Sequence, residues 1–205
     1  MAKMLGVLFY PLFVPTYGMA IFCYAFSLHM QPLAPVWISV AVAGTFFLTG
    51  LLPLTAIWLL MRKGEVTDLQ IEDPKERTIP YLYAVLGFAF WDYLVIRILH
   101  APDFLSFVAI GATVAIAVVA WINRFWKISA HLTGMGGLTG GLMSYCLYIG
   151  AVPTWGTVLL WFGLPWAVML ARLRLNAHTP LQVCAGWLLG ITTTFIPYCI
   201  FVYAV

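Results

Sequence analysis

Long apolar stretches joined by short polar links make up most of the chain. A transmembrane helix needs about 20 mostly apolar residues. Stretches of this kind cover residues 4–28, 35–61, 80–99, 104–122, 131–150, 152–170 and 180–204. The pattern therefore predicts an all-α integral membrane protein, a bundle of six to seven transmembrane helices. Residues 4–28 are too long for a signal peptide, so we expect them to be a retained first span.

One polar segment, residues 62–79, interrupts this pattern. Its sequence is RKGEVTDLQIEDPKERTI, and it contains nine of the seventeen charged residues of the chain. It is the one polar segment long enough to fold over a site, although a solvated loop explains its composition equally well.

Composition supports the membrane assignment. Hydrophobic residues are 63% and charged residues 8% of the 205 residues, against about 45–50% and about 25% in soluble domains. We expect one transmembrane domain over residues 1–205, with no nucleic-acid partner because no Lys/Arg run is present. The four cysteines lie inside apolar stretches, where they serve as small packing residues.

If every span crosses the membrane, nine of the ten basic residues emerge on one face. Segments 62–79, 123–131 and 171–179 belong to that face, and the links 29–34, 100–103 and 150–153 to the other. The positive-inside rule makes the cationic face cytoplasmic. Any of these basic residues that belongs to a functional site would not report on topology, and would make the charge difference between the two faces too large.

Two of the four histidines, His131 and His178, lie on the cationic face, each at the start of an apolar helix. Glycines spaced four apart follow both, and this spacing lets helix backbones approach closely in a membrane. These glycines are Gly136, Gly137, Gly140 and Gly141 after the first histidine, and Gly186 and Gly190 after the second. If the two helices pack together, the imidazoles lie near each other at one membrane face. The alternative is that the glycines serve packing alone and the histidines are interfacial residues.

Cations from three separate segments accompany these histidines. They are Lys75, Arg77, Lys127, Arg172 and Arg174. Arginine binds phosphate through a bidentate fork, and backbone N–H groups at a helix start, as at Ala130, add donors. One imidazole can attack phosphorus while the other protonates the leaving oxygen. These residue types favour a phosphate ester on a lipid.

Three segments resemble motifs of the type-2 phosphatidic acid phosphatase superfamily. Residues 171–190, ARLRLNAHTPLQVCAGWLLG, resemble the third motif, Ser-Arg-x5-His-x3-Asp, with Arg172 and His178 at the right spacing and Ala171 in place of Ser. Residues 127–134, KISAHLTG, resemble the second motif, Pro-Ser-Gly-His, through Ser129 and His131. Residues 72–80, EDPKERTIP, resemble a compressed first motif, Lys-x6-Arg-Pro, with altered spacing. The resemblance covers residues 70–195.

The resemblance implies a role for each matching residue. His178 would form a phosphohistidine, and His131 would donate a proton to the departing lipid alcohol. The phosphoryl oxygens would be held by Lys75, Arg77, Ser129 and Arg172, with Lys127 and Arg174 as further candidates. The family needs no metal, so the resemblance implies no cofactor, and the implied partners are a phosphorylated lipid substrate and membrane lipids.

Gln182 is the main departure from the family, which has Asp at this position, one helical turn after the nucleophile. Gln accepts a hydrogen bond from the imidazole but adds no charge. Two outcomes stay open: a slower phosphatase, or a silent relative that binds or moves a phospholipid. Asp73, Glu76 and Asp92 are candidates for the missing carboxylate.

A third hypothesis is a haem protein with His131 and His178 as axial ligands. The side of the membrane is also open. The charge count favours a cytoplasmic site, whereas many bacterial members of the resembled family place theirs on the periplasmic side of the inner membrane. The sequence leaves the lipid headgroup and the oligomeric state undetermined.

Overall fold

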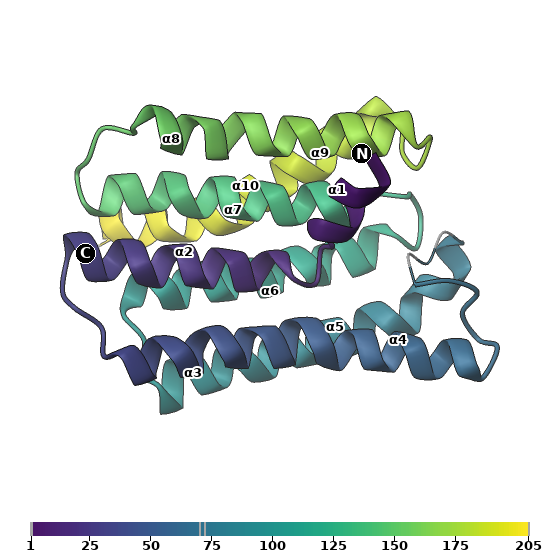
Figure 1. The fold of residues 1–205 in the computed structure, drawn as a ribbon, viewed down its shortest axis with the longest axis horizontal. Coiled ribbons are helices and arrows are strands. Elements are labelled where there is room, and N and C mark those ends of the chain that lie inside the picture. Colours follow the sequence, from purple (N-terminus) through teal and green to yellow (C-terminus); the bar gives the residue numbers. More distant parts are fainter. Residues whose placement is uncertain (1, 70, 72, 205) are drawn as a thin grey trace.

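The computed structural model describes residues 2–69, 71 and 73–204, with the side chains of 74, 75 and 201–204 left out. All of its regular elements are helices, most of them roughly parallel to one long axis (Figure 1). In chain order they are α1 (Ala2–Leu8), α2 (Val14–His29), α3 (Pro35–Thr45), η1 (Phe46–Leu51), α4 (Leu52–Arg62), η2 (Pro74–Arg77), α5 (Thr78–Tyr93), η3 (Leu94–Ile98), α6 (Asp103–Ile122), α7 (Ala130–Tyr148), α8 (Trp155–Val158), η4 (Leu159–Gly163), α9 (Leu164–Arg174) and α10 (Pro180–Ala204).

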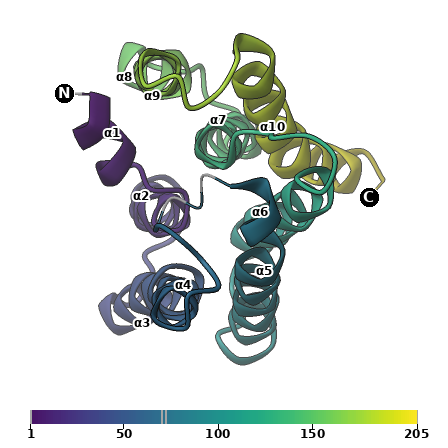
Figure 2. The same ribbon diagram turned by 90° about the vertical axis from the view of Figure 1, so that its right-hand side faces the viewer.

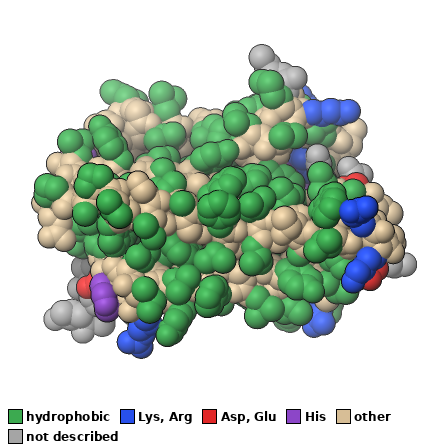
Figure 3. Space-filling view, turned by 60° about the horizontal axis from the view of Figure 1, so that its bottom comes forward, with side chains coloured by type: hydrophobic (Ala, Val, Ile, Leu, Met, Phe, Trp, Pro, Cys, Tyr) green, Lys and Arg blue, Asp and Glu red, His purple; other side chains and the backbone are tan. Residues whose placement is uncertain are grey.

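Among the described residues, five helices are long and apolar enough to cross a membrane. They cover Pro35–Arg62, Thr78–Ile98, Asp103–Ile122, Trp155–Arg174 and Pro180–Ile200. The all-α membrane bundle expected from the sequence is supported to this extent. On the face seen in Figure 3, hydrophobic side chains are spread along the length of the molecule, and the charged side chains lie toward its two ends.

The N-terminal span expected over residues 4–28 is not one helix, and that prediction was wrong. The chain leaves α1 at Leu8 and starts α2 at Val14. Pro11 lies between the two helices and Pro15 in the first turn of α2. Proline lacks the N–H that a helix interior needs but fits its first turn. The short α1 therefore turns aside from the bundle and packs against α9 (Figure 2).

Helix α7 lies at the centre of the bundle, with α2, α6, α9 and α10 around it (Figure 2). A Cβ on Gly136 would collide with the carbonyl of Trp187, and one on Gly190 with the carbonyl of Thr133. A Cβ on Gly186 would lie 2.5 Å from the Ser129 carbonyl oxygen. The predicted close packing of the two glycine-bearing helices is therefore confirmed. It brings the start of α10, after His178, beside the start of α7, which contains His131.

Candidate functional site

A cavity of about 80 Å³ lies where the polar loop and the starts of α7 and α10 meet. Four residues singled out in the sequence line it together: Arg77, His131, Arg172 and His178. A single water needs about 10–15 Å³ on this measure, so the cavity has room for several waters or a phosphate-sized group. The expected convergence of two imidazoles with cations from separate segments is present.

Arg77 is buried and held from two sides. Its Nε donates to the Ile71 carbonyl at 2.8 Å, and its Nη1 donates to Oδ1 of Asn123 at 2.7 Å. Asn123 in turn donates from Nδ2 to the Val119 carbonyl at 2.9 Å. Ile71 has a φ of +49°, a left-handed conformation that is costly for a β-branched residue. A strained backbone thus supplies an acceptor that helps to fix the guanidinium.

A capping box orients the ring of His178, which follows α9 and precedes α10. The Thr179 N–H donates to Oε1 of Gln182 at 3.0 Å, and the Gln182 N–H donates back to Oγ1 of Thr179 at 3.4 Å. This reciprocal pairing stabilises the first turn of a helix. Because Oε1 accepts from a backbone N–H, the orientation of the Gln182 amide is fixed.

The same Oε1 lies 3.3 Å from Nδ1 of His178. An oxygen acceptor requires Nδ1 to carry the proton, so Nε2 of the neutral ring keeps its lone pair. A lone pair on a ring that lines the cavity is what a nucleophile needs. Gln182 therefore occupies the place expected from the sequence and sets the tautomer without a charge.

The pKa of His178, which lies outside the membrane-spanning segments, is lowered to about 4. Burial is the largest cause, and the positive charges of Arg172, Lys127 and Arg77 act in the same direction, whereas the hydrogen bond that His178 donates to Gln182 raises the pKa. The imidazole is therefore neutral at pH 7, and three cations act on it from three different segments.

His131 is held by the N-terminal segment. Its Nε2 lies 3.1 Å from the carbonyl oxygen of Gly6 in α1, so Nε2 carries a proton and donates it. The ring of Tyr10 meets the imidazole edge-on at a centroid distance of 5.9 Å. A methyl group built on Gly6 would lie 3.3 Å from Nη1 of Arg172. A side chain at position 6 would therefore crowd Arg172, while the carbonyl of the same residue accepts from His131.

The remaining candidates occupy different places. Ser129 is fully buried and caps α7, where its Oγ accepts from the Leu132 N–H at 3.5 Å. Lys127 is half-buried, Arg174 is exposed, and the Lys75 side chain lies outside the described residues. Of the described lining residues, none is Ser129, Lys127 or Arg174.

Sequence reasoning missed four groups at this site. Tyr10, whose hydroxyl donates to the Leu69 carbonyl, lines the cavity, as does Tyr81. Asn123 anchors Arg77, and its position at the end of an otherwise apolar span was a signal that could have found it. The contact of the Gly6 carbonyl with His131 has no signal of that kind, because every residue has a carbonyl.

The carboxylates considered as substitutes for the missing Asp lie elsewhere. Oε2 of Glu76 accepts from the N–H and hydroxyl of Thr67 at 2.8 and 3.0 Å. Asp73 is exposed, and Asp92 lines a different cavity. The described lining of the site contains no carboxylate, so its chemistry depends on imidazole, guanidinium and phenol groups.

Within the described part of the chain, no three His, Cys, Asp or Glu side chains are grouped closely enough to hold a metal ion. Comparisons with protein-family models, with curated proteins and with solved structures find no match.

Proposed function

We propose that the protein is a membrane lipid phosphatase related to the type-2 phosphatidic acid phosphatase superfamily. The supporting observation is one cavity lined by two imidazoles and two guanidiniums, in which His178 has Nδ1 protonated and Nε2 free. Arg77 and Arg172 would bind the phosphoryl oxygens and stabilise the charge that grows on them in the transition state.

The proposed reaction has two steps. Nε2 of His178 attacks phosphorus and the bond from phosphorus to the lipid oxygen breaks, while His131, as the doubly protonated imidazolium, gives its Nε2 proton to that oxygen and becomes a neutral imidazole. Water then attacks the phosphohistidine, His131 takes up a proton from this water, and inorganic phosphate leaves. Since the Nε2 proton of His131 is donated to Gly6 in the resting protein, the substrate oxygen must replace the Gly6 carbonyl as its partner.

For the membrane topology, we propose that α2 and α7 cross together with the five apolar helices, which gives seven crossings. Their 16 and 19 residues correspond to about 24 and 28 Å of helix, close to the hydrocarbon thickness of about 30 Å. Glu65 is exposed in the polar loop at the site end. Labelling of Glu65→Cys by an impermeant thiol reagent in intact cells and in inverted vesicles will assign the side of the site.

The direct test is phosphate release from phosphatidic acid, phosphatidylglycerol phosphate and polyprenyl diphosphate in detergent. We expect His178→Ala to lose activity by about 10³-fold or more, since the nucleophile is removed. The matched control is His29→Ala, because His29 ends α2 and contacts the Ala25 carbonyl and the Tyr145 hydroxyl. Equal rates in the two variants would contradict the proposal.

A silent phospholipid-binding protein is the second candidate, and Gln182 favours it. The amide oxygen is neutral and shared between the Thr179 N–H and His178, so it stabilises an imidazolium less than a carboxylate does. Tight binding of phosphatidic acid without phosphate release by the wild-type protein would support this candidate over the phosphatase.

A further inference from the structure

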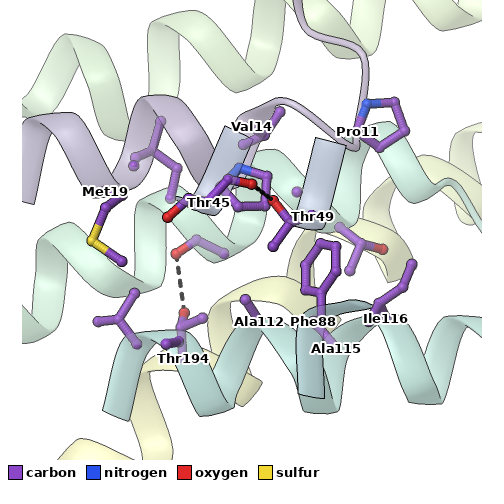
Figure 4. A pocket seen from close by; sticks show the side chains of 18 of the residues that line it. Pro11, Val14, Met19, Thr45, Thr49, Phe88, Ala112, Ala115, Ile116 and Thr194 are labelled. Carbon is purple, nitrogen blue, oxygen red and sulfur yellow. Dashed lines mark hydrogen bonds between the residues drawn. The ribbon is translucent and has the colours of Figure 1, made fainter. Parts of the chain in front are cut away.

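A second cavity, here called the chamber, lies inside the bundle and has a volume of about 100 Å³. Helices α2, α5, α6 and α7 contribute most of its lining, and Pro11, Thr45 of α3, Thr49 of η1 and Thr194 of α10 complete it (Figure 4). Pro11, Phe88, Ile116 and Ala130 line both the chamber and the cavity of the site. The two spaces are therefore neighbours that share one wall.

The chamber has few polar groups to offer an occupant. The hydroxyls of its threonines donate to backbone carbonyls: Thr45 to Ala41, Thr49 to Thr45, Thr133 to Ser129 and Thr194 to Gly190, at 2.7 to 3.0 Å. Asp92 is the one carboxylate among the described lining residues, and Phe88, four residues before it, is shared with the site. An occupant that needs no hydrogen bonds fits this lining best.

The chamber is long and narrow. Its lining on α6 runs from Leu105 to Val119, which is about 21 Å of helix. Small side chains face it along this length, including Ala109, Ala112 and Ala115. A volume of about 100 Å³ spread over that length leaves width for one chain and not for two side by side.

We propose that the chamber binds a single hydrocarbon chain of the lipid whose phosphate occupies the cavity of the site. This inference rests on the proposed function and makes it more specific. The substrate class becomes a phosphate or diphosphate on a lipid with one chain, such as a polyprenyl or long alkyl alcohol. A two-chain phospholipid would have to leave its second chain outside the chamber.

The test uses a long-chain alkyl phosphonate with a diazirine in the middle of its chain, so that binding is recorded without turnover. We expect photo-adducts on the chamber residues of α6 and α7 in the wild-type protein, located by mass spectrometry. Ala112→Phe fills the chamber and is expected to reduce these adducts at least tenfold, with Ala112→Leu as a milder variant. Val114→Phe is the matched control, because Val114 is two residues away on the exposed face of α6.

A second readout is the ratio of kcat/KM for a long alkyl phosphate to that for butyl phosphate. This ratio is expected to fall at least tenfold in Ala112→Phe and to stay at the wild-type value in Val114→Phe. Adducts confined to outer positions such as Val114, or chamber adducts that Ala112→Phe leaves unchanged, would overturn the inference. If the wild-type protein forms chamber adducts but hydrolyses neither the long alkyl phosphate nor butyl phosphate, the proposed function is contradicted. The inference that the chamber binds a hydrocarbon chain would still hold in that case.

Discussion

His178 and His131 stand in similar places but are held in different ways. Each lies at the start of a glycine-bearing helix and lines the same cavity. His178 takes its orientation from Gln182, four residues later in the first turn of α10, whereas His131 takes it from the Gly6 carbonyl, 125 residues earlier in the chain. The orientation of the first ring is therefore a local property, and that of the second depends on how α1 docks.

The difference also separates the chemistry of the two rings. The local contact leaves a lone pair on Nε2 of His178, and the distant contact leaves a proton on Nε2 of His131. One ring is set up to attack and the other to donate a proton. The loss of activity on removing His131 should therefore depend on the leaving group, whereas the loss on removing His178 should not.

The largest predicted effect uses this separation. With an alkyl phosphate, whose leaving group is poor, we expect His131→Ala to reduce kcat/KM by about 10²–10⁴-fold, as loss of a general acid does. With an aryl phosphate that has a much more acidic alcohol, the loss should shrink to about tenfold or less, because that leaving group needs little protonation.

For His178→Ala, activity should be lost to a similar extent with both substrates, since each requires the nucleophile. The measurement is steady-state kinetics of the two variants with the two esters. If both histidine variants respond to the leaving group in the same way, the assigned roles of the two rings are wrong.

A smaller effect is predicted for Gln182→Glu, which adds charge to the local contact. Glu keeps the length and the capping box, so the hydrogen bonds to Thr179 and His178 can persist. A hydrogen bond to a charged group contributes about 1.5–3 kcal/mol against about 0.5–1.5 for a neutral pair, and the difference corresponds to about tenfold in rate.

We therefore expect about a tenfold rise in phosphate release and a higher pKa of His178, measured by kinetics and by NMR titration. Gln182→Leu, which removes the acceptor, is the opposite control. No change in either quantity in Gln182→Glu would mean that the Nδ1 contact is unimportant for turnover.

The smallest predicted effect is on pH dependence. The ordinary pKa of His is about 6.5, and that of His178 is lowered to about 4. Protonation inactivates the nucleophile, so kcat/KM should stay level as the pH falls through 6.5 and decline only as it approaches about 4. A fall in kcat/KM centred near pH 6.5, in both the wild-type protein and Gln182→Leu, would contradict the claim that burial and nearby positive charges lower the pKa of His178.

The locally encoded part of the site was predictable from the sequence. The glycine spacing predicted that α7 and α10 pack together, and the alternating direction of helices with short links placed Arg77, His131, Arg172 and His178 at one end. The residues Thr179 to Gln182 also have the pattern of a capping box, although the sequence analysis treated Gln182 only as a departure from a motif.

The distant contacts were not predictable. The break near Pro11 turns α1 onto the site, and the acceptors that hold His131 and Arg77 are backbone carbonyls of Gly6 and Ile71. A carbonyl is present at every residue, so neither contact leaves a pattern in the sequence. These contacts arise only when segments far apart in the chain have docked.

The most direct test of the account is to trap the covalent intermediate on the wild-type protein. A phosphorylated lipid labelled at its phosphate is mixed with the protein, the reaction is stopped in alkaline detergent, and the label is located by mass spectrometry. The account predicts phosphate on Nε2 of His178 within the first turnover, and no labelled histidine in His178→Ala. Label on His131, or turnover with no labelled histidine, would contradict it.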